Sequence, residues 1–327
     1  MKPPCPTGAI CIRSSQLEAW ILPQGATLMG LWHCDVQHSL VLGFADVDAY
    51  ASNDIYAGAI VGPVANRITN ATLDISGTRY DMPANEGSTC LHSGAMGLHN
   101  RQWDIVTLTD SLVTLRCVLH AGDIGLPGRR TIDVTYDLAD AAALDLKIRA
   151  TSDRETVMNI AHHPYWSLDG MPDISGHVLT VAAQSYLPVN AAGLPTGLVA
   201  PVAQTDYDFT SPRRVPVNTG LDCNLCLDDK RRADLRTVAF LKGANGLEMR
   251  ISTTEPGLQL YNASALPFQD KPLIDGRRLA PFSGLALEPQ GWPDAPNNPA
   301  FPSIILSPKE RYFQHSRYEF GPIMFPI

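Results

Sequence analysis

Residues 131–149 read TIDVTYDLADAAALDLKIR and contain two runs in which apolar and polar side chains alternate. Every second position of each run is apolar, at Ile132, Val134, Tyr136, Leu138, Leu144, Leu146 and Ile148. Successive side chains of a strand point to opposite faces of its sheet, so this spacing predicts two half-buried strands. The pattern returns at 247–251 and on both sides of Ser76-Gly77, where it predicts a hairpin.

Turn-forming residues divide the rest of the chain in the same way. Gly and Pro recur at short intervals, and no long stretch has the 3.6-residue period of an amphipathic helix. Only residues 46–50 are expected to form a turn of helix, and residues 187–219 are expected to be loop-like. The chain is therefore predicted to be all-β and mostly antiparallel, a sandwich or a barrel. Neither a change of composition nor an internal repeat divides it, so residues 1–327 are predicted to form a single domain.

The composition is typical of a globular protein and argues against several kinds of partner. The 327 residues are 45% hydrophobic and 18% charged, with a net charge of -8. The basic pairs are scattered, so no nucleic-acid partner is expected. No apolar run approaches the length of a membrane span, so no membrane partner is expected either. The N-terminal residues lack the apolar centre of a signal peptide, and the seven cysteines are dispersed, so reduced thiols and a cytoplasmic location are expected.

A second informative segment is 284–303, which reads GLALEPQGWPDAPNNPAFPS. It begins as a strand, in which Glu288 shares a face with the small residues Gly284 and Ala286. The prolines from Pro289 onward are expected to end that strand, because proline cannot donate a ladder hydrogen bond. Trp292 is of the type that often forms a platform for a sugar or a base. From this segment alone, a proline-rich surface loop with a solvated glutamate is the simpler interpretation.

The pairing of a polar residue with small residues on one strand face is repeated along the chain. The polar residue and its small neighbour lie two or four positions apart in the sequence. The pairs are His163 with Ala161, Arg67 with Ala65, Gln259 with Gly257, Asp222 with Gly220, His92 with Gly94, and Glu288 with Ala286 and Gly284. Each residue alone is more simply a structural or surface group, but the repetition predicts one sheet face with polar groups around a cavity. A Glu and a His can act as general base and general acid near neutral pH, and the other groups suit a polyhydroxylated ligand.

Several other chemistries are disfavoured by the motifs. There is no nucleophile elbow, phosphate-binding glycine loop or HExxH set. His162 and His163 would point to opposite faces of a strand, as would Cys223 and Cys226, so a shared metal or a redox pair is not expected. The remaining histidines offer no recognised ligand spacing: His33, His38, His99, His120, His177 and His315.

Taken together, these motifs resemble those of the aldose 1-epimerase (galactose mutarotase) family. NIAHHPYWSL (159–168) resembles that family's NLTNHSYFNL, and GLALEPQGWPDAPNNPAFPSIIL (284–306) resembles LETQ-PDAPNQPNFPS. LGFADVDAY (42–50) with GAIVGPVANRI (58–68) is similar to GF-D-GY with GRxANRI. LHSGAMGLHNRQW (91–103) resembles LHGG-GF-KRVW, GLDCNL (220–225) resembles G-DHNF, and PGLQLY (256–261) resembles PGLQFY. The matches follow the family's order over almost the whole chain.

The resemblance implies a large antiparallel β-sandwich, the galactose mutarotase-like supersandwich. It also assigns a role to individual residues of the site. It makes His163 the general acid and Glu288 the general base. It makes five residues sugar-binding: Asn66, Arg67, His92, Asp222 and Gln259. Four positions depart from the family pattern, and they bear on sugar specificity and more mildly on activity: Pro63, Ser93, Cys223 and Pro289.

The implied reaction interconverts the α and β anomers of a free aldose, a hexose such as galactose or glucose. Glu288 removes the proton of the anomeric hydroxyl while His163 protonates the ring oxygen, and the opened sugar closes on its other face. This requires Glu288 ionised and His163 protonated at rest, which ordinary pKa values of about 4.3 and 6.5 nearly allow. No cofactor or metal is implied, and a monomer or weak homodimer is the default.

Two other functions fit the same residues. One is a sugar-binding or sensing protein that has kept the pocket and lost efficient turnover, motivated by the four departures. The other is a glycoside hydrolase or lyase, in which Asp222 would supply the second carboxylate that hydrolysis normally needs.

Overall fold

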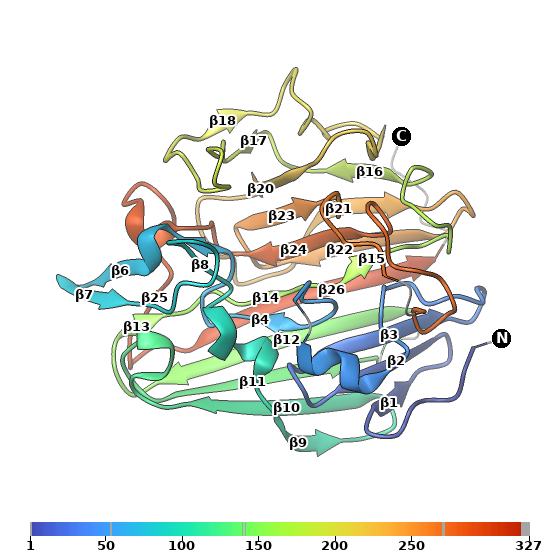
Figure 1. Cartoon of the computed structure of the whole chain (residues 1–327), viewed down its shortest axis with the longest axis horizontal. Helices are drawn as coiled ribbons and strands as arrows, with labels where there is room; N and C mark the ends of the chain where they lie inside the picture. Colours follow the sequence, from blue (N-terminus) through green and yellow to red (C-terminus); the bar gives the residue numbers. More distant parts are fainter. Residues whose placement is uncertain (1, 53, 139, 141, 270–271, 322–327) are drawn as a thin grey trace.

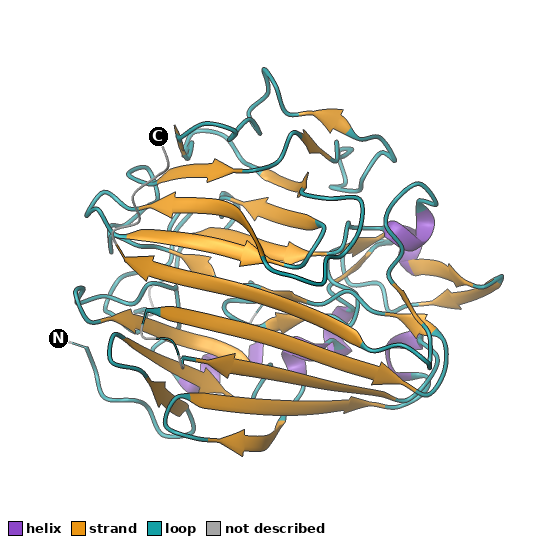
Figure 2. Cartoon of the chain, turned by 180° about the vertical axis from the view of Figure 1, so that it is seen from behind, coloured by secondary structure: helices purple, strands orange, loops and turns teal. Residues whose placement is uncertain are grey.

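The strands predicted at 131–149 lie side by side in a nine-stranded antiparallel sheet. They are seen in a computed structural model that describes residues 2–52, 54–138, 140, 142–269 and 272–321. The strand order is β19-β16-β21-β22-β26-β12-β11-β10-β9. Its strands are β9 (Asp104–Leu108), β10 (Leu112–Leu119), β11 (Arg130–Asp137), β12 (Ala143–Ser152), β16 (Val178–Val181), β19 (Arg213–Arg214), β21 (Arg236–Lys242), β22 (Glu248–Thr253) and β26 (Tyr312–Gly321). Figure 2 shows its long strands as one continuous layer.

A six-stranded antiparallel sheet, in the order β15-β24-β23-β20-β17-β18, forms the second large element. Its strands are β15 (Tyr165–Trp166), β17 (Ser185–Tyr186), β18 (Ala200–Pro201), β20 (Asp222–Cys226), β23 (Gly257–Tyr261) and β24 (Leu285–Gln290). Leu258, Leu260 and Leu287 of this sheet share one hydrophobic cluster with Val134 and Leu146 of the nine-stranded sheet. The two sheets therefore pack face to face, as expected for a sandwich.

Smaller sheets and short helical turns complete the described part of the fold (Figure 1). The three-stranded sheet consists of β1 (Ile10–Arg13), β2 (Leu17–Leu22) and β3 (Thr27–His33). The two-stranded sheets are β4 (Ile60–Val61) with β14 (Ala161–His162), β5 (Arg67–Ile68) with β8 (Cys90–Leu91), β6 (Thr72–Ile75) with β7 (Thr78–Asp81), and β13 (Thr156–Val157) with β25 (Ile305–Leu306). The 3-10 turns are η1 (Val47–Ser52), η2 (Thr69–Ala71), η3 (Gly94–Met96), η4 (Leu98–Asn100), η5 (Asp123–Gly125) and η6 (Ala295–Asn297). No helix in the described residues is long and apolar enough to cross a membrane.

The local predictions are confirmed at three places. β6 and β7 form the hairpin around Ser76-Gly77, with Ile75 opposite Thr78 and both turn residues at positive φ. η1 covers the turn of helix expected at residues 46–50. Residues 187–219 are mostly irregular and contribute only the two-residue strands β18 and β19.

The segment beginning at Gly284 departs from the prediction. β24 runs through Pro289 to Gln290 and lies between two strands, and Glu288 is buried, so this is not a surface loop with a solvated glutamate. Proline is accommodated because β15 pairs only with Leu285 and Ala286 and leaves that side of β24 open at Pro289. Trp292 is also buried, against Phe301, and its Nε1 donates to the Pro256 carbonyl. It belongs to the core and forms no sugar platform.

Candidate active site

The polar residues singled out in the sequence meet in one cleft of about 260 Å³. All seven line it: Asn66, Arg67, His92, His163, Asp222, Gln259 and Glu288. They come from three different sheets or the loops beside them, so only the fold brings them together. Sequence reasoning therefore found the polar lining of the cleft.

Strand register places the two central residues of the cleft side by side. Gln259 of β23 lies directly opposite Glu288 of β24. Their neighbours Leu258, Leu260 and Leu287 lie on the other face of the sheet, in the core. Only glycine fits at position 257, because a Cβ there would lie 2.4 Å from Asn224 Oδ1 on the neighbouring strand. The alternation of apolar and polar positions thus fixes which side chains face the cleft.

His163 is held on the cleft side by the backbone immediately after β14. Its N–H donates to the Ala59 carbonyl, and its own carbonyl accepts from the Gly58 N–H. The preceding residue, His162, points the other way, into the core beside Tyr136 and Tyr318. The prediction that these two adjacent histidines serve opposite faces is confirmed.

His163 and Glu288 form a buried pair with their reactive atoms close together. His163 Nε2 lies 3.6 Å from Glu288 Oε1, and the two side chains are 6% and 2% exposed. Burial lowers the pKa of His163 to about 4. Burial, and then the nearby Asp222 carboxylate, raises the pKa of Glu288 well above its usual value. Both shifts favour the neutral forms, an unprotonated His163 and a protonated Glu288, whereas ordinary pKa values favour the charged pair.

Arg67 lies between two carboxylates at the edge of the cleft. Its Nε donates to Glu86 Oε2 at 2.6 Å and its Nη2 to Glu86 Oε1 at 3.0 Å. Its Nη1 lies 3.4 Å from Asp222 Oδ2, and Asp222 Oδ1 accepts from Gln259 Nε2. The bidentate contact with Glu86 fixes the plane of the guanidinium. Asp222 in turn links Arg67 to the strand that carries Gln259.

Asn66 and His92 are joined by a backbone contact that sets the histidine tautomer. The Asn66 N–H donates to His92 Nδ1 at 3.1 Å, so the proton of the neutral imidazole is on Nε2. Burial and the neighbouring His163 lower the pKa of His92, which keeps it neutral. Tyr56 packs edge-on against His92, with ring centroids 4.6 Å apart. His92 is thus a fixed neutral donor.

None of the four departures from the family pattern lines the cleft. Ser93 Oγ accepts from the Val64 N–H and donates to the Val64 carbonyl, which ties the loop of His92 to that of Asn66. Cys223 is buried on the core face beside its neighbour Asp222. Pro289 accepts from Gln314 through its carbonyl. Ser93, Cys223 and Pro289 therefore make their contacts with the loops and the core around the cleft.

The sequence analysis missed three residues that shape the cleft. Tyr56 lines it, Glu86 holds Arg67, and Gly193 lies against the Arg67 guanidinium. Glu86 and Gly193 come from loops, where no periodicity marks a side chain as functional. Tyr56 follows a segment in which apolar and polar residues do not alternate. The direction of its side chain was therefore not predictable either.

Gly193→Ala is expected to weaken the binding of a ligand in the cleft, seen as a KM raised by about tenfold with little change in kcat. An added Cβ would lie 2.9 Å from Arg67 Cζ, and Gly193 has a φ of +72°. The change therefore displaces the guanidinium without touching His163 or Glu288. Gly246→Ala is the matched control, because Gly246 also has a positive φ but nothing lies within 4 Å of the added atom. Steady-state kinetics would contradict this role if both variants had the same KM.

Comparison with known proteins agrees with this geometry. A family model described as aldose 1-epimerase matches residues 8–319. The galactose mutarotase of Mus musculus is 35% identical over 321 residues, covering 95% of this chain and 93% of that protein. The aldose 1-epimerase of Escherichia coli (strain K12) is 32% identical over 322 residues, covering 92% and 91%. A crystal structure of an aldose epimerase homologue from C. elegans superposes with a TM-score of 0.89 at 32% identity, covering 97% of this chain and 100% of that one. The chain belongs to the aldose 1-epimerase family.

Proposed function

We propose that this protein is an aldose 1-epimerase that interconverts the α and β anomers of a free hexose such as galactose or glucose. The observation that carries the proposal is the His163–Glu288 pair, 3.6 Å apart in a cleft lined by polar side chains. Membership of the family and the names of its relatives support it. A cleft of about 260 Å³ has room for one monosaccharide.

In the proposed reaction, Glu288 takes the proton of the anomeric hydroxyl and His163 gives a proton to the ring oxygen. The C1–O5 bond breaks and the anomeric carbon becomes the aldehyde carbon of the open sugar. Rotation about C1–C2 presents the other carbonyl face, and the reverse proton transfers close the ring. In each step the pair takes one proton from the sugar and gives one proton to it. After ring opening and closure the pair has therefore returned to its starting state.

The remaining polar residues position the sugar in this proposal. Arg67 and His92 hold the ring and its oxygen, and the Nε2 proton of His92 supports a donating role. Asp222 and Gln259, already hydrogen-bonded to each other, hold hydroxyl groups. Asn66 completes the sugar-binding set. Its Oδ1 accepts a hydrogen bond from the backbone N–H of Arg67.

The proton count of the pair reconciles its resting state with its roles. A neutral His163 with a protonated Glu288 holds the same number of protons as a protonated His163 with an ionised Glu288. Transfer across the pair therefore reaches the reactive form without exchange with solvent. The polar hydroxyls of a bound sugar favour the charged form, because they replace the hydration that burial removes.

The acid limb of the pH–rate profile is expected near pH 4, well below the 6.5 of an ordinary histidine. Activity is lost as pH falls through the pKa of His163, about 4, because both groups are then protonated and no base remains. It is lost as pH rises through the raised pKa of Glu288, because no acid remains. Polarimetry of kcat/KM, corrected for the buffer-catalysed rate, measures the profile. An inflection near pH 6.5 would instead mean that His163 titrates as a solvent-exposed imidazole.

Polarimetry on freshly dissolved sugars tests the proposed function. α-D-galactose, α-D-glucose and L-arabinose would each be followed to anomeric equilibrium, and the protein is expected to accelerate at least the hexoses. A methyl α-galactoside is the matched control, because its anomeric oxygen carries no proton. Release of reducing sugar from it would overturn the proposal in favour of hydrolysis. Binding of the aldoses by calorimetry without acceleration would indicate a sugar sensor.

Asp222→Asn is expected to raise KM by about tenfold and leave kcat within a few-fold of wild type. The carboxylate contacts Gln259 and Arg67 and so orients binding groups, whereas the proton transfers belong to His163 and Glu288. Initial rates over a range of sugar concentration separate the two constants. A loss of kcat as large as that of Glu288→Gln would assign Asp222 to the chemistry.

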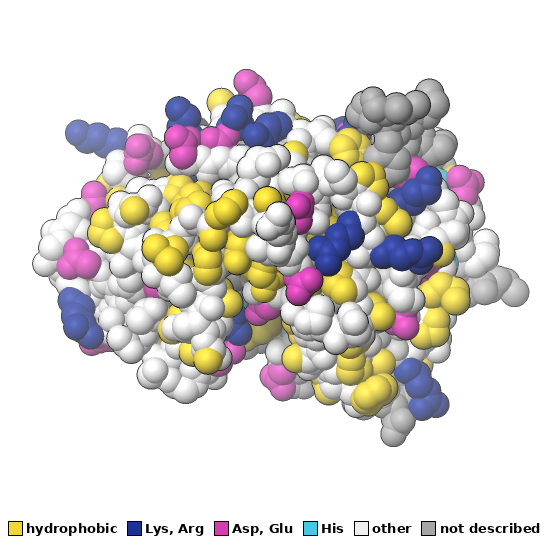
Figure 3. All heavy atoms as spheres, turned by 90° about the horizontal axis from the view of Figure 1, so that it is seen from above, with side chains coloured by type: hydrophobic (Ala, Val, Ile, Leu, Met, Phe, Trp, Pro, Cys, Tyr) yellow, Lys and Arg dark blue, Asp and Glu magenta, His cyan; other side chains and the backbone are white. Residues whose placement is uncertain are grey.

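We further propose that residues 1–327 form a single domain in a reducing, cytoplasmic compartment, as a monomer or weak homodimer. A hydrophobic cluster that takes residues from Ile10 to Phe320 supports the single domain, and seven free cysteines support the compartment. We propose no nucleic-acid partner. On the face seen in Figure 3, Lys and Arg side chains are interspersed with Asp and Glu, so no basic patch dominates it.

A further inference from the structure

The side chains of His33, Cys34 and Asp35, all of types that can bind a metal ion, converge where β3 ends, outside the cleft. His33 Nδ1 lies 4.0 Å from Cys34 Sγ and 3.6 Å from Asp35 Oδ2. Cys34 Sγ lies 3.6 Å from Asp35 Oδ1. None of the three lines the cleft that holds His163 and Glu288. In the described residues this is the one group of three His, Cys, Asp or Glu side chains whose ligand atoms all lie within 4.8 Å of one another.

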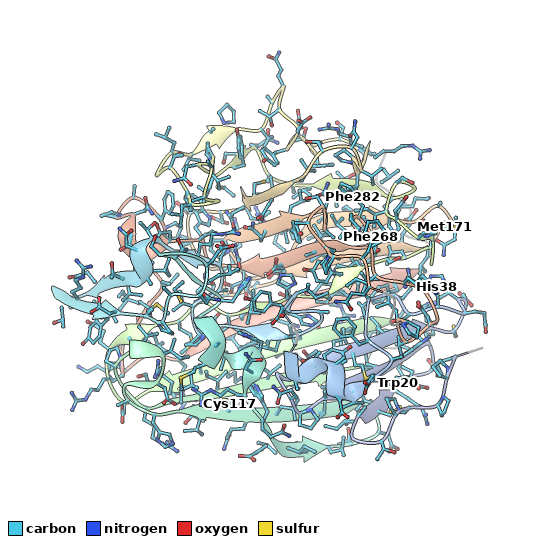
Figure 4. All side chains as sticks on the ribbon, in the orientation of Figure 1. Trp20, His38, Cys117, Met171, Phe268 and Phe282 are labelled. Carbon is cyan, nitrogen blue, oxygen red and sulfur yellow. The ribbon has the colours of Figure 1, made fainter. Side chains whose placement is uncertain are left out.

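The turn that carries these side chains is fixed by its backbone. The Cys34 N–H donates to the Gln16 carbonyl, and the Val36 N–H donates to the His33 carbonyl. Trp32, just before the turn, is buried against Trp20, with ring centroids 4.0 Å apart (Trp20 is labelled in Figure 4). A site here would therefore need little ordering of the chain when it binds a ligand.

The orientation of His33 suits a metal ion at Nδ1. The Asp35 N–H donates to Nδ1 at 3.2 Å, so this nitrogen carries the lone pair and the proton is on Nε2. A metal ion at Nδ1 would take the place of this one hydrogen bond. The imidazole is 3% exposed, so its orientation is fixed, while Asp35 is 79% exposed and free to adjust. The thiol of Cys34 is directed toward the Asp35 carboxylate. The thiol proton thus lies among the three donors, where a cation would sit.

We propose that His33, Cys34 and Asp35 form a binding site for one Zn²⁺ ion, with water as the fourth ligand. Binding forms one N–Zn, one S–Zn and one O–Zn bond, and the thiol proton passes to solvent. A nitrogen, a thiolate and a carboxylate are the donors that zinc prefers. Tetrahedral bonds of ordinary length would place these donors about 3.3 to 3.6 Å apart. One ligand atom from each side chain already lies within 4.8 Å of the other two, so a modest contraction would bring the three donors together.

Sequence reasoning passed over this site for a physical reason. The sequence analysis found no recognised ligand spacing for His33, and the side chains of successive residues in a strand would point to opposite faces. The strand ends at His33, and the chain turns at the next two residues, so three successive side chains converge instead.

Titration of the full-length protein with Co²⁺, in the presence of a non-chelating phosphine reductant, tests the proposal. One Co²⁺ per chain is expected to bind and to give a thiolate-to-cobalt charge-transfer band in the near ultraviolet. One equivalent of Zn²⁺ should remove that band. The rate of sugar anomerisation is expected to stay unchanged, so the result is independent of the proposed function.

Two exposed positions give the decisive variants. Cys34→Ser should abolish the band, and Asp35→Asn should weaken Co²⁺ binding by about tenfold or more. Cys5→Ser, at another cysteine outside the buried core, is the matched control and should retain the band. Absence of a band in wild type, its retention in Cys34→Ser, or its loss in Cys5→Ser would each overturn the proposal.

Discussion

Replacing Glu288 by Gln is expected to slow anomerisation by about 10²- to 10⁴-fold with little change in KM. Gln has almost the same shape but cannot accept and return a proton, so the sugar still binds and the ring no longer opens efficiently. His163→Asn is expected to lose a similar factor, because the acid half of the pair is gone. Because Glu288 is buried without a partner on Oε2 among the described residues, replacing its carboxyl group by an amide should not destabilise the fold.

The control for this pair comes from the adjacent histidine. His162 is also buried, but it faces the core between Tyr136 and Tyr318. His162→Phe should therefore keep most of the activity that His163→Asn loses. Polarimetric initial rates on α-D-galactose compare the variants, and thermal unfolding checks that each is folded. Equal losses at positions 162 and 163 would contradict the assignment.

The free energy of unfolding is expected to fall steeply with pH below about 6.5, and His162→Phe should make that fall shallower. Burial lowers the pKa of His162 to about 3 in the folded protein, against 6.5 for an ordinary histidine. Below pH 6.5 this histidine binds a proton in the unfolded chain but not in the folded protein. The free energy of unfolding therefore declines as pH falls toward the folded-state pKa. Removing this one site should lower the slope by about 1.4 kcal/mol per pH unit.

Denaturant unfolding at several pH values measures this effect. Between about pH 6 and 4.5, the difference in unfolding free energy between His162→Phe and wild type should shift in favour of the variant by about 2 kcal/mol. Between about pH 7.5 and 8.5, where this histidine titrates in neither state, the two curves should run parallel. Parallel curves over the whole range would mean that His162 is protonated equally in both states.

Much of this fold follows from side-chain alternation, because burial of one sheet face imposes a period of two. The alternation of Ile132, Val134 and Tyr136 located β11, and the Gln259 position within PGLQLY identified the cleft face of β23. The same reasoning separated His162 from His163. These predictions depend only on strand geometry, which the local sequence determines.

Other features depend on contacts that the local sequence does not encode. Pro289 lies within a strand because β15 is too short to reach it. Trp292 is buried because it packs against Phe301 and donates to the Pro256 carbonyl. Glu86 reaches Arg67 from a loop with no periodic pattern. The directions of the pKa shifts of His163 and Glu288 could not be predicted from the sequence either, because they depend on how completely the fold excludes water.

The most direct test of the central claim is a double-mutant cycle by polarimetry with wild type, His163→Asn, Glu288→Gln and the double variant. If the two residues act as one proton-transferring pair, the double variant should be no more than a few-fold slower than the slower single variant. Losses that multiply, or a wild-type protein that does not accelerate anomerisation of any aldose, would contradict the account.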